Sequence, residues 1–352
     1  DIRNENGCYP ASLKDTMKWK EQFPAETDFE KICKSSDAEW GGEKERKEIF
    51  RTEHLKFRYL EQVPVLEDVN LLLDGRATAI VGQNGAGKTT TIRILMQVFA
   101  ANKGTVTLDG VPFSTKKIGI GYLPEERGLY PKKTVTEQLM YLAQLRGMKK
   151  AEAAKAVKHW LERMGVEQYA SRKLETLSKG NQQKVQLAAT LVHNPPVIIL
   201  DEPFSGLDPV NSQVLKDVIQ EQIAENKLVI FSSHQMSYVE EFCNDIVIMN
   251  HGETVLSGDL REIKTLFGHG RLVLSLNGKD GEETEAIVKE RFSGLVQPDG
   301  IHKDFVVLKM TGETTKTQVF RALAESGLDV ESFGDYRPSL NDIFVERAGD
   351  EA

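Results

Sequence analysis

The segment that most constrains the fold is a glycine-rich loop, Gly82-Gln-Asn-Gly-Ala-Gly-Lys-Thr89. The apolar residues 77–81 before it predict a short buried strand, and residues 89–99 predict the helix that follows. Glycines in such a loop let backbone amides wrap around a phosphate group, and the start of the helix adds a partial positive charge. We therefore expect the chain to fold around a strand, a phosphate-binding loop and a helix.

The residues of this loop have expected roles at a bound nucleotide. Lys88 is expected to bridge the β- and γ-phosphates, and the Thr89 hydroxyl is expected to ligate Mg²⁺. The alternative is a chance glycine-rich turn, which the strand, the Lys-Thr pair and the helix together disfavour. The expected nucleotide-binding residues here are Gly82, Gln83, Asn84, Gly85, Ala86, Gly87, Lys88, Thr89 and Thr90.

A second motif, Val197-Ile-Ile-Leu-Asp-Glu-Pro203, places two carboxylates after another apolar strand. Open α/β sheets bind their ligands at the carboxyl ends of the strands. Asp201 is expected to bind Mg²⁺, directly or through water, and Glu202 to accept a proton from the attacking water or to polarise it. Without the glycine-rich loop, such a pair is often a solvated strand end, but beside that loop the functional interpretation is favoured.

Strand and helix patterns alternate around this second motif. A helix is expected from Ser178, a strand over 197–201, a helix over 212–224 and a strand over 228–231. This alternation predicts an α/β fold with a mostly parallel sheet and helices on its faces.

Two other patterns lie within the same part of the chain. Residues 55–59 and 65–71 predict a pair of antiparallel strands. Residues 134–175 are expected to be helical, and Thr134 and Glu137 have the spacing of a capping box.

The pattern changes past about residue 270. Short strands and helices there predict a small α+β unit without catalytic residues, for which an accessory or dimer-stabilising role is the modest inference. We divide the chain into residues 1–50, a linker or a fragment of an upstream module, residues 51–268, the main domain, and residues 269–352, the accessory domain. The chain begins at Asp1 rather than Met, so a fragment is one interpretation of the whole sequence.

Composition excludes several classes of protein. The net charge of −8 offers no basic surface for nucleic acid, so we expect no nucleic-acid partner. The three cysteines, Cys8, Cys33 and Cys243, match neither a metal motif nor a disulfide framework, which indicates a reducing compartment. Apolar runs such as 197–200 are too short to cross a bilayer, and no signal peptide is visible. If the protein works at a membrane, a partner is expected to supply the spanning helices.

The stretch Leu177-Ser-Lys-Gly-Asn-Gln-Gln-Lys-Val-Gln186 lies between the glycine-rich loop and the acidic strand end. This combination resembles the ABC ATPases, the motor subunits of ATP-driven transporters. The wider family usually reads Leu-Ser-Gly-Gly-Gln here, so Lys179 and Asn181 are departures. The resemblance implies a P-loop NTPase fold with an antiparallel β subdomain, a helical subdomain over about 130–180, and ATP and Mg²⁺ as cofactors.

The resemblance also implies a dimer. In ABC ATPases the serine matching Ser178, together with Gly180 and Asn181, faces the γ-phosphate bound by a second subunit, and the loop ending at Asp208 crosses to that subunit. This chain carries one such set, so a second ABC ATPase subunit, identical or not, is an expected partner. Lys179 would add positive charge near that phosphate, or else point to solvent.

Three further residues take their expected roles from the resemblance. His234 follows the strand 228–231 and matches a histidine that contacts the γ-phosphate and orients water and the carboxylate of Glu202, which gives a catalytic set of Lys88, Glu202 and His234. Tyr59 matches an aromatic residue that stacks on adenine, although a core tyrosine is nearly as consistent and Phe57 shares its face. Glu125 stands where the family usually has glutamine, and its carboxylate could reach Mg²⁺ or water.

Two branches of the family are represented in the sequence. Residues 57–59, 65–71 and 79–85 are similar to the energy-coupling-factor importer ATPases for vitamins and metals. From Thr91 onward the Tyr-Leu-Pro-Glu-Glu-Arg-Gly-Leu-Tyr loop, residues 177–181 and the tail 338–344 resemble sodium- or drug-extrusion ATPases, which commonly carry a small C-terminal domain. A mosaic joined near the glycine-rich loop, natural or a sequencing artefact, is one hypothesis.

The loop of Glu125 and the helical residues 134–175 are where such ATPases touch their membrane partner, and both are exporter-like. We therefore expect a cytoplasmic subunit, peripheral on the inner face of the cell membrane, that drives export of an ion or small molecule through a separate transmembrane permease. An importer ATPase is the first alternative. A non-transport ABC ATPase of translation or DNA repair is disfavoured because neither a second cassette nor a coiled coil is present. A cassette that only binds ATP is disfavoured by its catalytic residues.

Overall fold

The computed structural model describes residues 50–59, 64–73, 77–126 and 128–348. The interpretation of residues 1–50 as a linker or a fragment therefore lies outside the described residues, apart from Phe50, and Arg127 lies outside them too. The chain divides into two compact units, the first ending at Gly258 and the second beginning at Asp259. The sequence places this boundary after residue 268, and the difference is one helix, α9 (Leu260–Gly268), which belongs to the second unit.

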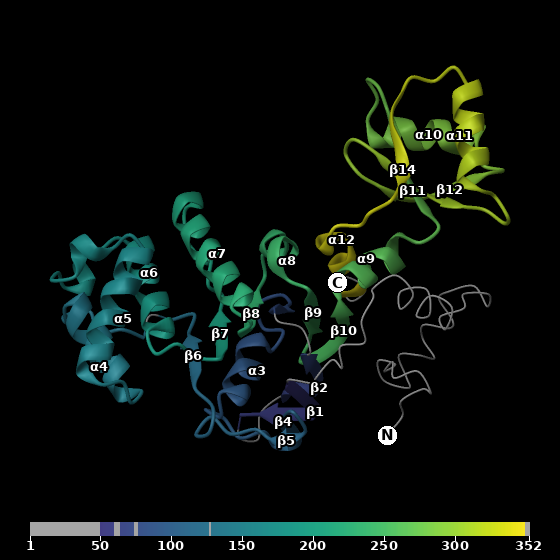
Figure 1. Ribbon diagram of the computed structural model, residues 1–352. Coiled ribbons are helices and arrows are strands. Elements are labelled where there is room, and N and C mark those ends of the chain that lie inside the picture. The colour runs from purple at the N-terminus through teal and green to yellow at the C-terminus, as the bar shows by residue number, and fades with distance from the viewer. Residues whose placement is uncertain (1–49, 60–63, 74–76, 127, 349–352) are drawn as a thin grey trace. The chain divides into compact units, whose positions relative to one another are not determined.

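In the described residues, a ten-stranded sheet forms the centre of the first unit (Figure 1). The spatial order of its strands is β5 (Val111–Pro112), β4 (Lys103–Leu108), β1 (Phe50–Arg58), β2 (Pro64–Leu73), β10 (Glu253–Asp259), β9 (Asp245–Asn250), β3 (Ala77–Val81), β8 (Leu228–Ser233), β7 (Val197–Asp201) and β6 (Ile120–Leu123). The predicted antiparallel pair is confirmed in β1 and β2, and the predicted parallel sheet in β9, β3, β8, β7 and β6.

The three middle strands of the parallel part position the functional residues. Every residue of β3, β7 and β8 is buried, as expected for parallel strands that helices cover on both faces. Because these strands run in the same direction, their carboxyl ends meet at one edge of the sheet. Asp201 lies directly opposite Ser232 in the ladder, and Val81, the last residue of β3, lies opposite Ser233.

Helices α3 (Lys88–Leu95), α7 (Pro209–Ala224) and α8 (Met236–Phe242) contact this part of the sheet. Helix α3 is shorter than the predicted 89–99. Its C-cap is Met96, and Gln97 adopts a φ of +56°. The Gln97 side chain bonds to the backbone of Phe113 and Thr115, which holds the chain in a turn instead of a further helical turn.

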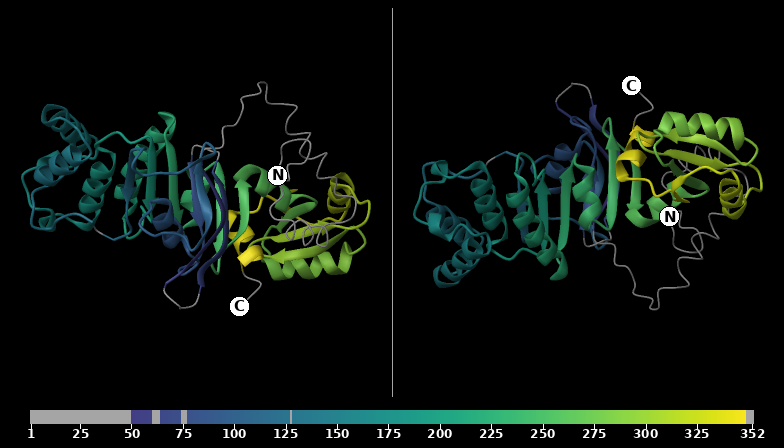
Figure 2. Two further views of the ribbon diagram at one scale, coloured as in Figure 1. Left: turned by 90° about the horizontal axis from the view of Figure 1, so that it is seen from below. Right: turned by 90° about the horizontal axis from the view of Figure 1, so that it is seen from above.

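The predicted helical region over 134–175 contains α4 (Val135–Leu145), α5 (Lys150–Arg163) and two short 3₁₀ turns, η1 (Glu167–Tyr169) and η2 (Leu174–Thr176). The helix predicted from Ser178 follows as α6 (Lys179–Leu191). Figure 2 shows α4 and α5 beyond the β6 end of the large sheet. The predicted capping box of Thr134 and Glu137 is confirmed at the start of α4. Arg163 of α5 pairs with Glu221 of α7, which links the helical region to a helix of the sheet.

The second unit has a four-stranded antiparallel sheet in the order β12 (Val296–Ile301), β13 (Val306–Met310), β11 (Arg271–Leu276) and β14 (Val330–Asp335). Helix α10 (Gly281–Arg291) follows β11 and helix α11 (Lys316–Glu325) follows β13, which gives the split β-α-β arrangement of a ferredoxin-like unit. Its core joins alternate residues of β11, such as Leu272 and Leu274, to Val288 and Leu323 of the two helices. Helix α12 (Leu340–Ala348) contacts α9.

No helix among the residues that the structure describes is long and apolar enough to cross a membrane.

Candidate nucleotide-binding site

The glycine-rich loop joins β3 to α3, as the sequence predicts. Gly87 adopts a φ of +100°, and a Cβ atom there would lie 2.6 Å from Cδ2 of Leu66, so the position requires glycine. Residues 83–85 are exposed, whereas Lys88 begins the helix with only 6% of its surface exposed. An exposed loop that turns into a helix N-terminus offers free amides to an anion such as a phosphate.

The ammonium group of Lys88 lies inside the loop. Its Nζ donates to the carbonyl oxygens of Gly82 at 2.8 Å and Gln83 at 3.1 Å. The same nitrogen lies 3.7 Å from Oε1 of Glu202. A buried cation is thus held at the carboxyl edge of the sheet, between the loop and the strand end that carries the two acids.

Asp201 ends β7 with 1% of its surface exposed. Its Oδ1 accepts hydrogen bonds from Oγ of Ser232 at 2.6 Å and from Oγ1 of Thr89 at 3.2 Å. Burial raises the pKa of Asp201, and these two hydroxyl donors act in the opposite direction. Its Oδ2 is buried and has no hydrogen-bond partner in the described residues. A buried carboxylate oxygen without a donor, beside the Thr89 hydroxyl, fits a hard divalent cation such as Mg²⁺.

Glu202 adopts a φ of +49°, an uncommon conformation for a residue with a side chain. Its backbone N–H donates to Oγ of Ser232 at 3.0 Å. Its Oε2 lies 2.9 Å from Nδ1 of His234, and its Oε1 faces Lys88. The imidazole of His234 is 44% exposed, whereas the carboxylate is only 8% exposed, so the pair extends from the interior to solvent. We name Lys88, Thr89, Asp201, Glu202 and Ser232 the strand-end cluster.

The start of α6, residues 178–181, presents a different surface. Ser178 caps the helix, because its Oγ accepts from the backbone N–H of Asn181 at 3.3 Å. Ser178 and Lys179 are both exposed. Figure 1 shows α6 on the α4 and α5 side of β6, whereas α3 lies on the other side of that strand. No hydrogen bond or ion pair in the described residues joins this helix start to the strand-end cluster.

Gly180 connects the same helix start to α7. It is buried, and a Cβ atom there would lie 2.5 Å from Nδ2 of Asn211. Asp208 caps α7 by accepting from the backbone N–H of Asn211 at 3.0 Å, and this bond lowers the pKa of Asp208. The structure therefore brings Gly180 and Asp208 together through Asn211.

Tyr59 lies in an aromatic group with Phe57 and Phe99. Its ring centroid is 4.9 Å from that of Phe57 and 5.6 Å from that of Phe99. Phe57 is only 8% exposed, whereas Tyr59 is 39% exposed. Of the two aromatic residues weighed from the sequence, Tyr59 is therefore the one with a face available to a ligand.

Glu125 lies in an exposed loop after β6. Nε2 of Gln186 on α6 holds this loop through the carbonyl oxygens of Pro124 and Glu126, each at 3.2 Å. No hydrogen bond joins Glu125 to Thr89 or Asp201 in the described residues. Its charge does act on Tyr122, whose pKa is raised to about 12 by burial first and by Asp201 next.

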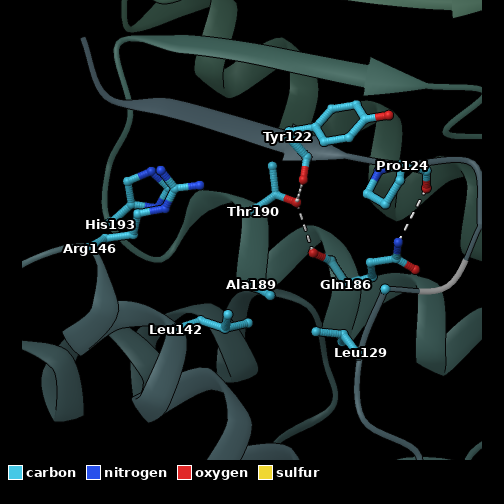
Figure 3. A pocket seen from close by; sticks show the side chains of 10 residues that line it. Tyr122, Pro124, Leu129, Leu142, Arg146, Gln186, Ala189, Thr190 and His193 are labelled. Carbon is cyan, nitrogen blue, oxygen red and sulfur yellow. Dashed lines mark hydrogen bonds between the residues drawn. The ribbon is translucent and has the colours of Figure 1, made fainter. Parts of the chain in front are cut away.

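A hollow of about 190 Å³ lies beside this loop, between α4, α6 and β6 (Figure 3). Gln186 and Thr190 of α6 form one wall and bond to the backbone of Pro124 and Tyr122. His193 and Arg146 lie next to each other at another wall (Figure 3). Burial lowers the pKa of His193, and the charge of Arg146 adds to this.

Comparison with known proteins agrees with this geometry. Residues 66–205 match the family model described as ABC transporter, and residues 258–348 match the C-terminal domain of DrrA1-3-like ATP-binding proteins. An ABC transporter ATP-binding protein of Alkalihalophilus pseudofirmus is 41% identical over 277 residues, which cover 77% of this chain and 98% of that protein. The chain belongs to the ABC transporter ATP-binding proteins.

Solved structures of the ABC family share the fold. An ATP-binding subunit of an ABC transporter is 31% identical, with a TM-score of 0.57 over 62% of this chain and 93% of that one. The protein cbiO1 of Clostridium perfringens, part of the complex cbiONQ, is 25% identical, with a TM-score of 0.55 over 70% of this chain and 97% of that one. The protein is thus an ATP-binding ABC ATPase, and the fold and enzyme class predicted from the sequence are confirmed.

Sequence reasoning missed two residues of the ABC ATPase site. Ser232 bonds to both acidic residues, and its only signal is that two serines end an otherwise apolar strand before His234. Arg93 of α3 acts on the pKa values of Asp201 and Tyr122. The sequence around Arg93 does not distinguish it from an ordinary arginine on the exposed surface of a helix.

Proposed function

We propose that this ABC ATPase hydrolyses Mg²⁺-ATP in the cytoplasm and drives export through a separate transmembrane permease. The observation that carries the hydrolytic part is the 2.9 Å contact between Glu202 and His234 beside the buried Lys88. A carboxylate held by a histidine at the edge of a phosphate-binding loop suits a group that accepts a proton from an attacking water.

The residues divide the chemistry between them. Lys88 and the loop amides bind the β- and γ-phosphates, and Tyr59 stacks on the base. Thr89 and Asp201 hold Mg²⁺, which when bound supplies positive charge to the phosphate oxygens. These two side chains would supply few ligands, so phosphate oxygens of the nucleotide and water would supply the rest, as is usual for Mg²⁺. Glu202 accepts the proton of the attacking water, and His234 holds the carboxylate of Glu202. The carboxylate of Glu125, in the exposed loop after β6, would reach Mg²⁺ or a water molecule.

A second subunit completes the site. The start of α6, where the capping residue Ser178 is exposed, Asn181 half-buried and Gly180 buried, suits the γ-phosphate of ATP bound by another cassette. Asp208 lies next to this helix start through Asn211 and is exposed to the same partner. Closure of two chains around two nucleotides would convert binding and hydrolysis into motion.

The permease is proposed to dock on the helical region and the loop of Glu125. Tyr130, Tyr141 and Leu145 are large apolar residues that are each more than half exposed near this loop or on α4. Export rather than import rests on the exporter-like loop, helix start and C-terminal tail in the sequence. The match to a DrrA-like C-terminal domain supports the same branch.

Steady-state ATPase assays on the wild type and Glu202→Gln test the hydrolytic part. The variant keeps the size of the side chain and is expected to bind ATP while losing about 10²- to 10⁴-fold in kcat. Glu126→Gln, in the exposed loop after β6, is the matched control and should retain the wild-type rate. Equal rates in wild type and Glu202→Gln would disprove the assignment of Glu202.

Co-purification from native membranes tests the transport part. The chain is expected to recover a multi-span permease that resembles exporter subunits. Recovery of an importer scaffold instead would reverse the direction of transport. Recovery of ribosomes or DNA-repair proteins without any membrane protein would favour a non-transport ABC ATPase.

A further inference from the structure

The hydroxyl group of Ser232 is completely buried at the end of β8, with 0% of the residue exposed. It donates to Oδ1 of Asp201 at 2.6 Å and accepts from the backbone N–H of Glu202 at 3.0 Å. A serine hydroxyl has one donor and two acceptor positions, so both bonds form at once. One oxygen atom therefore connects the residue proposed to hold Mg²⁺ with the residue proposed to activate water.

The first bond decides which oxygen of Asp201 is left for a cation. Ser232 and Thr89 both donate to Oδ1, whereas Oδ2 has no partner in the described residues. A hydrogen bond to an ionised carboxylate is stronger than one between neutral groups, and it favours the charged form that a metal requires. Ser232 thus fixes the orientation of the carboxylate and leaves one oxygen free.

The second bond stabilises an uncommon backbone conformation. Glu202 has a φ of +49°, which turns its N–H toward the Ser232 side chain. The same conformation directs its carboxylate toward His234 and Lys88. Uncommon backbone conformations persist where surrounding contacts determine them, and the buried Ser232 hydroxyl is such a contact.

We propose that Ser232 is a positioning residue, which sets the distance and orientation between the Mg²⁺-holding carboxylate of Asp201 and the carboxylate of Glu202. It does so from the adjacent strand, so the positions of the two acids depend on the register of β7 and β8. The proposal rests on the proposed roles of these acids. It concerns Ser232 alone, because the neighbouring Ser233 bonds to the backbone of Gln235 in the turn after the strand.

Ser232→Ala and the matched control Ser233→Ala test the proposal in the full chain. We expect Ser232→Ala to lower kcat and to raise the Mg²⁺ concentration for half-maximal rate, each by about 10- to 100-fold, as for partners of metal ligands in general. Binding of ADP, measured by calorimetry without turnover, should become less sensitive to Mg²⁺, while ADP affinity in EDTA stays at the wild-type value. Ser233→Ala should leave all of these quantities unchanged.

A purely structural serine would behave differently. Wild-type Mg²⁺ dependence of ADP binding in Ser232→Ala would overturn the proposal, as would an equal effect in Ser233→Ala. If Ser232→Ala does not fold, Ser232→Cys replaces it, because sulfur fills the same place but donates and accepts weakly. A wild-type Mg²⁺ response in a folded Ser232→Cys would also overturn the proposal.

The proposed roles of Glu202 and Ser232 are tested by separate measurements. If Glu202→Gln hydrolyses ATP at the wild-type rate, the proposed role of Glu202 fails. The Mg²⁺ dependence of ADP binding in Ser232→Ala still tests the Ser232–Asp201 contact in that case, because it requires no hydrolysis.

Discussion

The strand-end cluster and the start of α6 are both proposed to contact a γ-phosphate, the first that of the chain's own nucleotide and the second that of a partner's, and they differ in exposure and in hydrogen bonding. In the cluster, Lys88, Asp201 and Ser232 are buried, and hydrogen bonds within the chain hold them. At the start of α6, Ser178 and Lys179 are exposed, and among the described residues the serine side chain bonds only to its own helix. Buried polar groups require partners, whereas exposed ones have water until a ligand or subunit arrives. The difference indicates that one half of the site is assembled within the chain and the other half is offered to a partner.

The two lysines of these regions give the largest expected effect. Lys88→Ala removes a buried cation and leaves Glu202 facing the loop without it, so we expect kcat to fall by about 10²- to 10³-fold. Lys179→Ala removes an exposed charge, and the loss should stay below about tenfold. ATPase rates and ATP affinity of both variants provide the measurement. Equal losses in kcat would contradict the proposed difference between the two regions, because the exposed lysine would then be as important as the buried one.

A smaller effect is expected where the start of α6 meets the cap of α7. Gly180→Ala places a Cβ atom 2.5 Å from Nδ2 of Asn211, so the start of α6 or the cap of α7 has to shift. We expect a loss of about 1–3 kcal/mol in the free energy of unfolding, measured by urea titration. Gly119→Ala is the control, because its nearest neighbour would be at an ordinary 3.6 Å.

Removal of the neighbour tests the cause of this loss. The double variant Gly180→Ala with Asn211→Ala should lose less stability than the sum of the two single variants, because the two closest contacts, with Nδ2 and Cγ of Asn211, are removed. A purely additive result would mean that Asn211 is not the group that excludes a side chain at Gly180.

The contrast between the two regions also explains what could be predicted from the sequence. The glycine-rich loop, the strand ending in Asp201 and the cap Ser178 are local patterns, and each was found within a few residues of its position. Ser232 was missed because its role depends on the register that sets β8 beside β7, which places it opposite Asp201. The contact between Glu202 and His234 was expected from the family resemblance alone, since 32 positions separate them.

In the second unit, too, an element that depends on strand pairing could not be predicted from the sequence. The sequence predicts strands over 272–276, 305–310 and 329–333, which correspond to β11, β13 and β14, but it does not predict β12. It contains Pro298, Asp299 and Gly300, which disfavour a strand, and its pairing with β13 shifts register between Pro298 and Gly300. It lies at the edge of the sheet, where a missing N–H and a bulge are tolerated. Only tertiary pairing could have identified it.

The smallest expected effect concerns the hollow of Figure 3, which lies near the loop of Glu125 and is neither fully buried nor fully exposed. Burial lowers the pKa of His193, and its ring nitrogens have no hydrogen bond of good geometry in the described residues. Below about pH 6.5 the unfolded chain takes up a proton at this histidine that the folded chain does not. Stability should therefore decrease as the pH falls from about 6.5 toward the lower pKa of the folded state.

His193→Gln removes this contribution, so the free energy of unfolding should depend less on pH between neutral and mildly acidic conditions than in the wild type. His159→Gln, on the exposed surface of α5, is the matched control and should retain the wild-type dependence. Urea titrations at a series of pH values provide the measurement. If the free energy of unfolding of both variants depends on pH as in the wild type, His193 makes no special contribution to this dependence. In that respect the hollow would then resemble the exposed start of α6 and not the buried strand-end cluster.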